Sequence, residues 1–189
     1  MASEVSLTRQ LQQYSGGDRE IAEAVLRLVM PRLHQIALKQ LRREQRFAPI
    51  SPTELIHEVW LRNLRKGGWP VRDREHFYAI AARAMRQVLV DLARQRLASA
   101  RGSGAAPESL DQRGVGNASV ESGPEQVVEI GILMEKLERA DPATARVVEM
   151  HYFAGFTLEE IGEITGLSFR QVRNRWEKGR DWLKQRLTS

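Results

Sequence analysis

The side chains between residues 168 and 178 include hydrogen-bonding groups that match the edges of DNA bases. Arginine can donate two parallel hydrogen bonds to guanine, and asparagine or glutamine can pair in the same way with adenine. At about 100° per residue, Arg170, Asn174 and Lys178 fall on one face of a helix, flanked by Gln171 and Arg173. We therefore expect contacts to duplex DNA from Ser168, Arg170, Gln171, Arg173, Asn174 and Lys178.

Within this set, base reading and phosphate binding fall to different residues. Arg170, Gln171, Arg173 and Asn174 are expected to read bases. Lys178 is better suited to phosphates, as is Arg180, and phosphate contacts position a protein without specifying a sequence.

Two helix-start patterns and one glycine frame this segment. Thr157 with Glu160, and Ser168 with Gln171, each match a capping box, which satisfies backbone donors at a helix N-terminus. Gly166 lies between them, where the end of a helix favours a positive φ. Two helices joined by a short turn with glycine form a helix-turn-helix. The joint pattern favours a DNA reader over a solvated amphipathic helix without a partner.

Apolar positions can hold these two helices together. Leu158, Ile161 and Ile164 share one side of the first helix. On the second helix, the side expected to pack inward comprises Phe169, Val172, Trp176, Gly179 and Leu183.

The net charge of +5 is unevenly distributed along the 189 residues. Residues 1–100 are basic, with 17 Lys and Arg against 10 Asp and Glu. Residues 125–163 hold nine acidic and three basic side chains, whereas residues 164–189 hold seven basic and two acidic ones. The C-terminal part is therefore a dipole that can present its positive end to phosphate.

Several classes of function find no support in the sequence. The chain has no cysteine, which excludes disulfides and thiolate metal sites. Its four histidines lack metal-ligand spacing. No glycine loop suited to phosphate and no nucleophile–base motif occurs, so we expect neither an enzyme nor a cofactor. No membrane-spanning run or signal peptide is recognised, and we expect a cytoplasmic protein without membrane insertion.

A change in composition divides the chain. Residues 101–124 are rich in Gly and Ser and contain little that could be buried, which is typical of a flexible linker. Helical periodicity lies on both sides, with no strand-like alternation. We therefore predict an all-α fold: two small helical domains, residues 1–100 and 125–189, joined by that linker, the second a helix-turn-helix domain.

The N-terminal domain is expected to hold four helical segments. The first spans residues 7–14, and the second spans 19–46 with a kink or break near Met30, because Pro31 interrupts it. Ser51 to Glu54 form a third capping box, with proline at the first helical position. The last helix is expected over residues 73–97.

Two further helices should precede the helix-turn-helix. The first begins at about Pro124. Asp141 followed by Pro142 is a typical helix start, and Gly155 should end that second helix after Phe153.

The order of these elements resembles the extracytoplasmic-function (ECF) group of bacterial sigma factors. Residues 54–61, ELIHEVWL, resemble the helix that binds core RNA polymerase. Residues 76–96 resemble the helix that melts the promoter, and residues 141–153 and 157–187 are similar to region four. The resemblance covers nearly the whole chain except the linker, and the order of the domains carries it more than any single motif.

The resemblance implies a transcription initiation factor that binds core RNA polymerase, at its clamp and flap, and promoter DNA. The C-terminal domain would read the minus-thirty-five element, and the N-terminal domain would melt the minus-ten element. An anti-sigma factor is a further partner that the resemblance allows.

The implied roles fall on two sets of N-terminal residues. Basic and aromatic side chains suit an unpaired strand, because bases stack on rings and phosphates need positive charge; these are Trp69, Arg72, Arg74, Tyr78, Arg83, Arg86 and Arg94. Phe77 is expected in the core instead. Contacts with the polymerase clamp are assigned to Glu54, Glu58, Trp60, Arg62 and Arg65, with Trp60 as an exposed apolar residue beside the polar face.

Two other classes of function stay open at this point. A stand-alone repressor or activator would bind duplex DNA without polymerase, usually as a dimer on a palindromic site. A protein-interaction module would dock its basic helix on an acidic partner, and a steep fall of DNA affinity with salt would argue against it.

Overall fold

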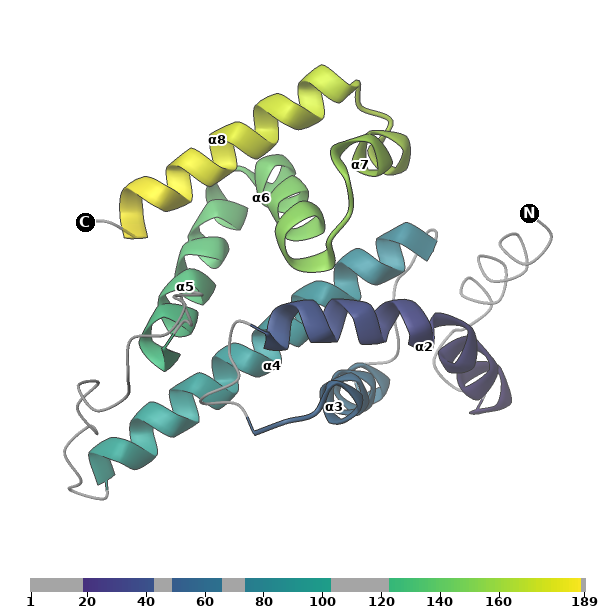
Figure 1. The fold of residues 1–189 in the computed structure, drawn as a ribbon, viewed down its shortest axis with the longest axis vertical. Helices are drawn as coiled ribbons and strands as arrows, with labels where there is room; N and C mark the ends of the chain where they lie inside the picture. The colour runs from purple at the N-terminus through teal and green to yellow at the C-terminus, as the bar shows by residue number, and fades with distance from the viewer. Residues whose placement is uncertain (1–18, 43–48, 66–73, 103–122, 188–189) are drawn as a thin grey trace, which may run out of the picture.

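The computed structural model describes residues 19–42, 49–65, 74–102 and 123–187, and within these ranges helices and the short segments that join them make up the chain, without a strand (Figure 1). The all-α prediction is therefore confirmed for the described residues. The elements are α2 (Arg19–Leu41), α3 (Pro52–Arg65), α4 (Arg74–Gly102), α5 (Pro124–Ala140), α6 (Pro142–Val148), the π-helix η1 (Glu149–Ala154), α7 (Leu158–Thr165) and α8 (Phe169–Leu187).

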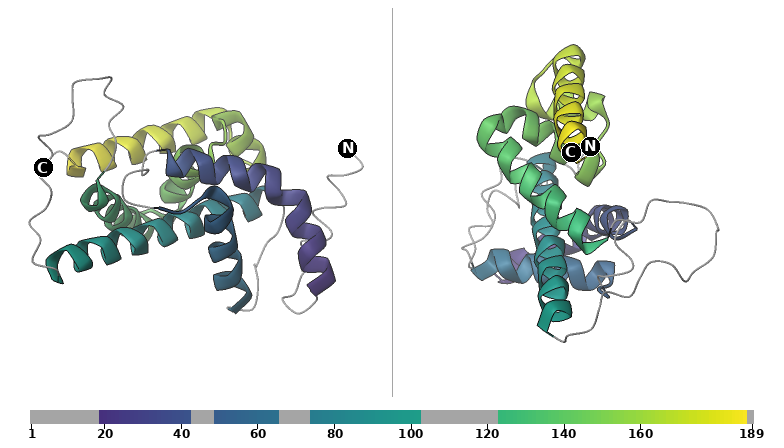
Figure 2. Two further views of the ribbon diagram at one scale, coloured as in Figure 1. Left: turned by 60° about the horizontal axis from the view of Figure 1, so that its bottom comes forward. Right: turned by 90° about the vertical axis from the view of Figure 1, so that its left-hand side faces the viewer.

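Helices α2, α3 and α4 pack on one another around a common apolar core. Phe77, Met85 and Leu89 of α4 meet Ile36 of α2 and Leu55 of α3, and all five are fully buried. Helix α2 continues through its internal proline and changes direction part-way along its length (Figure 2). A proline ring removes one helical hydrogen bond and clashes with the preceding turn, which explains the bend.

The C-terminal helices form a second packed group, in which α8 lies across α5 and α6 (Figure 1). Its buried side chains include Met134, Met150, Ile161 and Val172. Gly179 allows the closest approach: a Cβ atom at this position would lie 2.4 Å from Val148 Cγ2. The long helix α8 therefore packs directly against α6 at this glycine.

Several predicted boundaries differ from the structure. Helix α4 extends to Gly102, five residues beyond its predicted end. The predicted helix after Asp141 is α-helical only to Val148 and finishes as the π-helix η1, which ends at Gly155 with φ of +80°. The predicted helix over residues 7–14 and most of the predicted linker lie outside the described residues.

The two groups of helices also pack against each other, along α4. Helix α5 crosses α4, and η1 contacts both α4 and α2 (Figures 1 and 2). The periodicity of the sequence did not predict this contact. A helix face with polar and apolar residues has the same sequence pattern whether it faces water or another group of helices.

Candidate nucleic-acid interface

The caps predicted around the helix-turn-helix are confirmed. Thr157 Oγ1 accepts the backbone N–H of Glu160 at 3.1 Å, and the Glu160 carboxylate accepts the N–H of Thr157 at 2.7 Å. Gly166 takes the left-handed conformation with φ of +71°. These contacts fix where α7 begins and ends, and so fix the turn that leads into α8.

The second cap sets the first turn of α8. Gln171 Oε1 accepts the N–H of Ser168 at 2.9 Å, and the Ser168 hydroxyl accepts the N–H of Gln171 at 3.3 Å. The side-chain amide group of Gln171 has no hydrogen bond within the described residues, so its two N–H groups remain available to an adenine edge.

The inward side of α8 agrees with the prediction except at its first residue. Val172 and Gly179 are buried, and the Trp176 ring meets His151 edge-on with 4.5 Å between ring centroids. Phe169 was expected to pack inward, but it is 48% exposed. The prediction was therefore wrong for Phe169, which is the first residue of α8, and an exposed aromatic ring at this end of the helix can contact a thymine methyl group.

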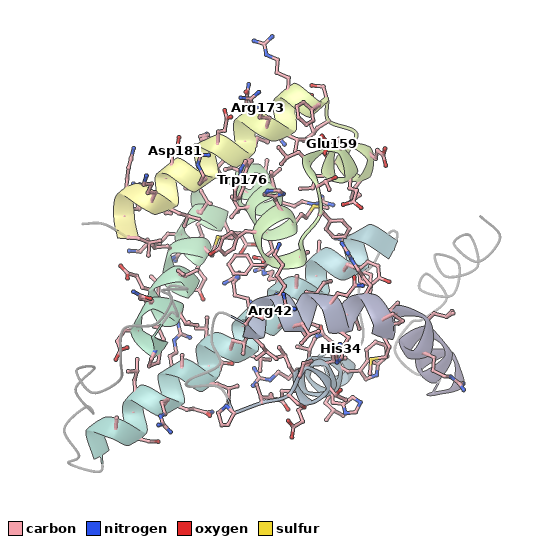
Figure 3. All side chains as sticks on the ribbon, in the orientation of Figure 1. His34, Arg42, Glu159, Arg173, Trp176 and Asp181 are labelled. Carbon is pink, nitrogen blue, oxygen red and sulfur yellow. The ribbon has the colours of Figure 1, made fainter. Side chains whose placement is uncertain are left out.

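The outward side of α8 carries the predicted reading residues. Arg170, Gln171, Arg173 and Asn174 are all exposed. Figure 3 shows Arg173 on the outer side of α8 and Trp176 on the side that faces α6. The Arg173 Nε donates to Glu177 Oε1 at 2.9 Å, an exposed pair that DNA can replace at small cost.

Lys178 has a partner that its position in the sequence did not suggest. Its Nζ donates to Asp141 Oδ2 at 2.8 Å, and Asp141 also accepts the N–H and hydroxyl of Thr144, at 3.0 and 2.7 Å. Asp141 is therefore both the N-cap of α6 and a tie between α6 and α8. The Lys178 hydrogen bond, followed by those from Thr144, holds the pKa of Asp141 well below its usual range.

The lowered pKa of Asp141 makes the free energy of unfolding depend on pH. A lowered folded-state pKa contributes stability above the unfolded value, about 3.9, and loses it as pH falls. Urea unfolding of the wild type should therefore show a falling midpoint below about pH 4. Asp141→Asn should flatten that dependence and cost about 0–1 kcal/mol at neutral pH, because asparagine caps a helix as well as aspartate does but loses the charge that pairs with the exposed Lys178. An unchanged slope in the variant would mean that other carboxyls cause the acid sensitivity.

The predicted single-strand surface on α4 is only partly exposed. Arg83 and Arg94 are exposed, but Arg86 and Tyr78 are buried, and the expectation that these two lie on an open surface is wrong for this conformation. Arg86 is covered by the C-terminal helices, and Tyr78 packs edge-on against the Phe77 ring. Phe77 is in the core, as predicted. Trp69, Arg72 and the side chain of Arg74 lie outside the described residues.

Helix α3 presents part of the predicted polymerase-binding face. Ser51 caps it by accepting the Glu54 N–H at 3.2 Å, while Glu54 accepts the Ser51 N–H at 2.7 Å, which lowers the pKa of Glu54. Arg62 bridges Glu58 and Asp91, at 2.7 Å each.

The apolar part of that face differs from the prediction. Trp60 is only 8% exposed, so its assignment as an exposed residue is wrong, and Leu61, 49% exposed, is the apolar side chain on the open side. The two are neighbours on one helix at the edge of its apolar stripe, where packing against the other helices decides which side chain is covered. The side chain of Arg65 lies outside the described residues.

A capped helix-turn-helix with an exposed basic reading face, joined to a second helical group with exposed arginines, defines a DNA-binding protein. A sequence model of the ECF sigma factor family matches residues 4–189, and the chain belongs to that family. It directs RNA polymerase to promoters and is not an enzyme. No curated protein matches the chain. Among the described residues, no helix is long and apolar enough to cross a membrane, and no cluster of side chains is suited to a metal ion.

Proposed function

We propose that α8 reads the upstream, minus-thirty-five element, and that the N-terminal helices bind the polymerase clamp and melt the minus-ten element. The single observation that carries the first part is the exposed face of Arg170, Gln171, Arg173 and Asn174 on a helix whose opposite side is seated on α6. Helix-turn-helix proteins place such a helix in the major groove, with its N-terminal residues at the base edges.

The N-terminal assignments rest on exposed charge and on the family. Glu58, Leu61 and Arg62 form a face of α3 on which an apolar side chain lies beside an ion pair, as in the core and rim of a protein interface. Arg83 and Arg94 on α4 supply positive charge for the backbone of an unpaired strand. The protein would act in the bacterial cytoplasm, where polymerase meets the chromosome. An anti-sigma factor and the polymerase flap remain predicted partners.

Transcription in vitro on genomic DNA tests the proposal and identifies the promoter sequence at the same time. Purified core polymerase and the full-length chain are incubated with sheared genomic DNA of the host bacterium, and the 5′ ends of the transcripts are sequenced. We expect a small set of start sites with a shared upstream element that core polymerase alone does not use. Start sites identical to those of core alone would contradict the proposal.

A second prediction concerns the reading face itself. Arg173→Ala or Asn174→Ala should reduce discrimination between the native and a scrambled upstream element about tenfold, because one bidentate base contact is worth about 1–3 kcal/mol. Affinity for core polymerase should be unchanged. Lys184→Ala is the matched control, because it removes a charge three turns further along α8. It should weaken binding to the native and the scrambled element equally. Equal loss of core binding in the Arg173 variant would show that this face binds polymerase instead.

A further inference from the structure

The first turn of α8 carries an exposed aromatic side chain beside the polar residues that are proposed to read bases. Phe169 is the first residue of the helix and is 48% exposed. At about 100° per residue, its side chain leaves the helix about 40° away from that of Arg173, which Figure 3 shows on the outer side of α8. Residues four positions apart are neighbours on a helix surface, so Phe169 and Arg173 border one another.

The apolar contacts that fix the start of α8 are made by other residues. Leu167, which precedes the cap residue Ser168, is partly buried against the core, and Val172 is completely buried. An apolar residue before the cap and another at the fourth helical position commonly fix the angle at which the chain enters a helix. The packing of α8 therefore does not depend on the Phe169 ring.

The polar residues around Phe169 leave one base without a dedicated reader. Arginine pairs with guanine, and asparagine or glutamine pairs with adenine, whereas thymine is marked in the major groove by its apolar C5-methyl group. A phenylalanine ring is one of the groups that contact this methyl. The structure describes all of residues 168–175, and Phe169 is the exposed apolar side chain among them.

The spacing along α8 relates this ring to the base that Arg173 reads. A helix rises 1.5 Å per residue, so Phe169 and Arg173 are separated by about 6 Å along the axis. That distance corresponds to about two base steps at 3.4 Å each. Helix-turn-helix proteins place the N-terminal residues of this helix at the base edges. A thymine that contacts Phe169 should therefore lie within about two base pairs of the base that contacts Arg173.

We propose that Phe169 is a specificity-determining residue, whose ring contacts the C5-methyl group of a thymine in the upstream element. The inference rests on the proposed function of α8 and adds a reader of thymine to its polar residues. Burial of one methyl group is worth about fourfold in affinity. The contact therefore selects thymine at one position without dominating the total affinity for the promoter.

Replacing thymine by deoxyuridine tests the contact, because the two bases differ only in the C5-methyl group. The full-length chain and core polymerase are bound to fluorescein-labelled promoter duplexes in which each thymine of the upstream element is replaced singly, and affinity is measured by anisotropy. The wild-type complex should lose about fourfold in affinity at one thymine. Phe169→Ala should bind the unmodified duplex more weakly and should not distinguish thymine from deoxyuridine at that position.

Two variants serve as controls. Leu187→Ala removes a 40% exposed apolar side chain from the other end of α8 and should keep the wild-type ratio of affinities for thymine and deoxyuridine. Phe169→Leu keeps an apolar side chain and should restore part of that ratio. Phe169→Ala should also unfold in urea at the wild-type midpoint, which separates the loss of the methyl contact from a loss of structure.

Three results would overturn the inference. The first is a wild-type complex that is indifferent to every deoxyuridine, or sensitive only outside two base pairs of the position at which Arg173→Ala relaxes base choice. The second is an unchanged ratio in Phe169→Ala. The third is a loss of affinity for core polymerase in Phe169→Ala, because the ring would then contact the polymerase.

Failure of the proposed function has a different result. If Arg173→Ala and Asn174→Ala both discriminate between the native and the scrambled upstream element as the wild type does, α8 does not read that element. If these two variants lose discrimination while Phe169→Ala keeps the wild-type ratio, only the thymine contact is overturned.

Discussion

Replacing Arg86 with methionine should open the closed form, in which the two groups of helices pack against each other along α4 and Arg86 forms a buried ion pair with Glu149 of η1. The substitution keeps an unbranched side chain of similar reach but leaves the Glu149 carboxylate buried without its guanidinium. Breaking a buried pair by removing one partner costs about 3–5 kcal/mol. Because the pair lies between the two helix groups, the chain can avoid this cost by separating them and returning Glu149 to water. A cysteine pair, Val90→Cys on α4 with Gly131→Cys on α5, reports the opening, because a Cβ atom at Gly131 would lie 3.5 Å from the Cβ of Val90, within the usual disulfide separation of about 3.5–4.5 Å. In this background, Arg86→Met should slow disulfide formation at least tenfold.

Two further variants decide whether charge or packing is responsible. Arg86→Met with Glu149→Leu replaces the pair by apolar side chains and should restore disulfide formation close to the wild-type rate, since such replacements are often neutral or stabilising. Arg83→Met removes an exposed partner and should have a small effect, because exposed pairs contribute about 0–1 kcal/mol. If Arg86→Met closes as fast as the wild type, the buried pair does not hold the two groups together.

The effect of Arg86→Met should also depend on pH. Burial raises the pKa of Glu149, and Arg86 opposes that rise. Without Arg86, the closed form favours the protonated carboxyl, whereas in the open form the group titrates near its ordinary value of about 4.3. The closed form therefore binds more protons than the open form above that pH, so closure should recover as the solution is acidified towards it. The rate of disulfide formation in the variant is therefore divided by the rate of the same cysteine pair with Arg86 intact at each pH, which cancels the pH dependence of thiolate reactivity. A ratio independent of pH would contradict a buried, unpaired Glu149.

The features that the sequence predicted well are local. A capping box needs only two residues three positions apart, and the boxes at Ser51, Thr157 and Ser168 were found with the predicted partners. The positive φ of Gly166 follows from the same short-range rules. These features place the helix-turn-helix and therefore the reading face of α8, which is why that part of the candidate site could be assigned from the sequence.

The features that the sequence missed depend on partners far along the chain. Arg86 reads as one of several arginines on a helix face, and its partner Glu149 lies 63 positions away on a different helix. Periodicity reports which side of a helix is polar, but not whether another helix covers that side. For the same reason Trp60 and Phe169 were assigned to the wrong environments: each lies at the edge of an apolar stripe, where tertiary packing decides burial.

Any side chain at Gly179 should destabilise the C-terminal helices, and one as large as that of Gly179→Leu should unfold them. A Cβ atom at this position would lie 2.4 Å from Val148 Cγ2 and 2.9 Å from Thr144 Cγ2, both on buried β-branched side chains of α6 that have few alternative rotamers. Overpacking costs about 1–3 kcal/mol even for small insertions. For Gly179→Ala, part of that cost is offset by a helix-propensity gain of up to about 1 kcal/mol.

The two substitutions should therefore form a graded series. Gly179→Ala should lower the free energy of urea unfolding by about 1–2 kcal/mol. Gly179→Leu should lower it by more than Gly179→Ala does and should abolish binding of the upstream element, because α8 can no longer pack on α6. Arg180→Ala, at the exposed neighbouring position, is the control for stability and should unfold at the wild-type midpoint. Wild-type stability in Gly179→Leu would mean that α8 does not pack on α6 through this glycine in solution.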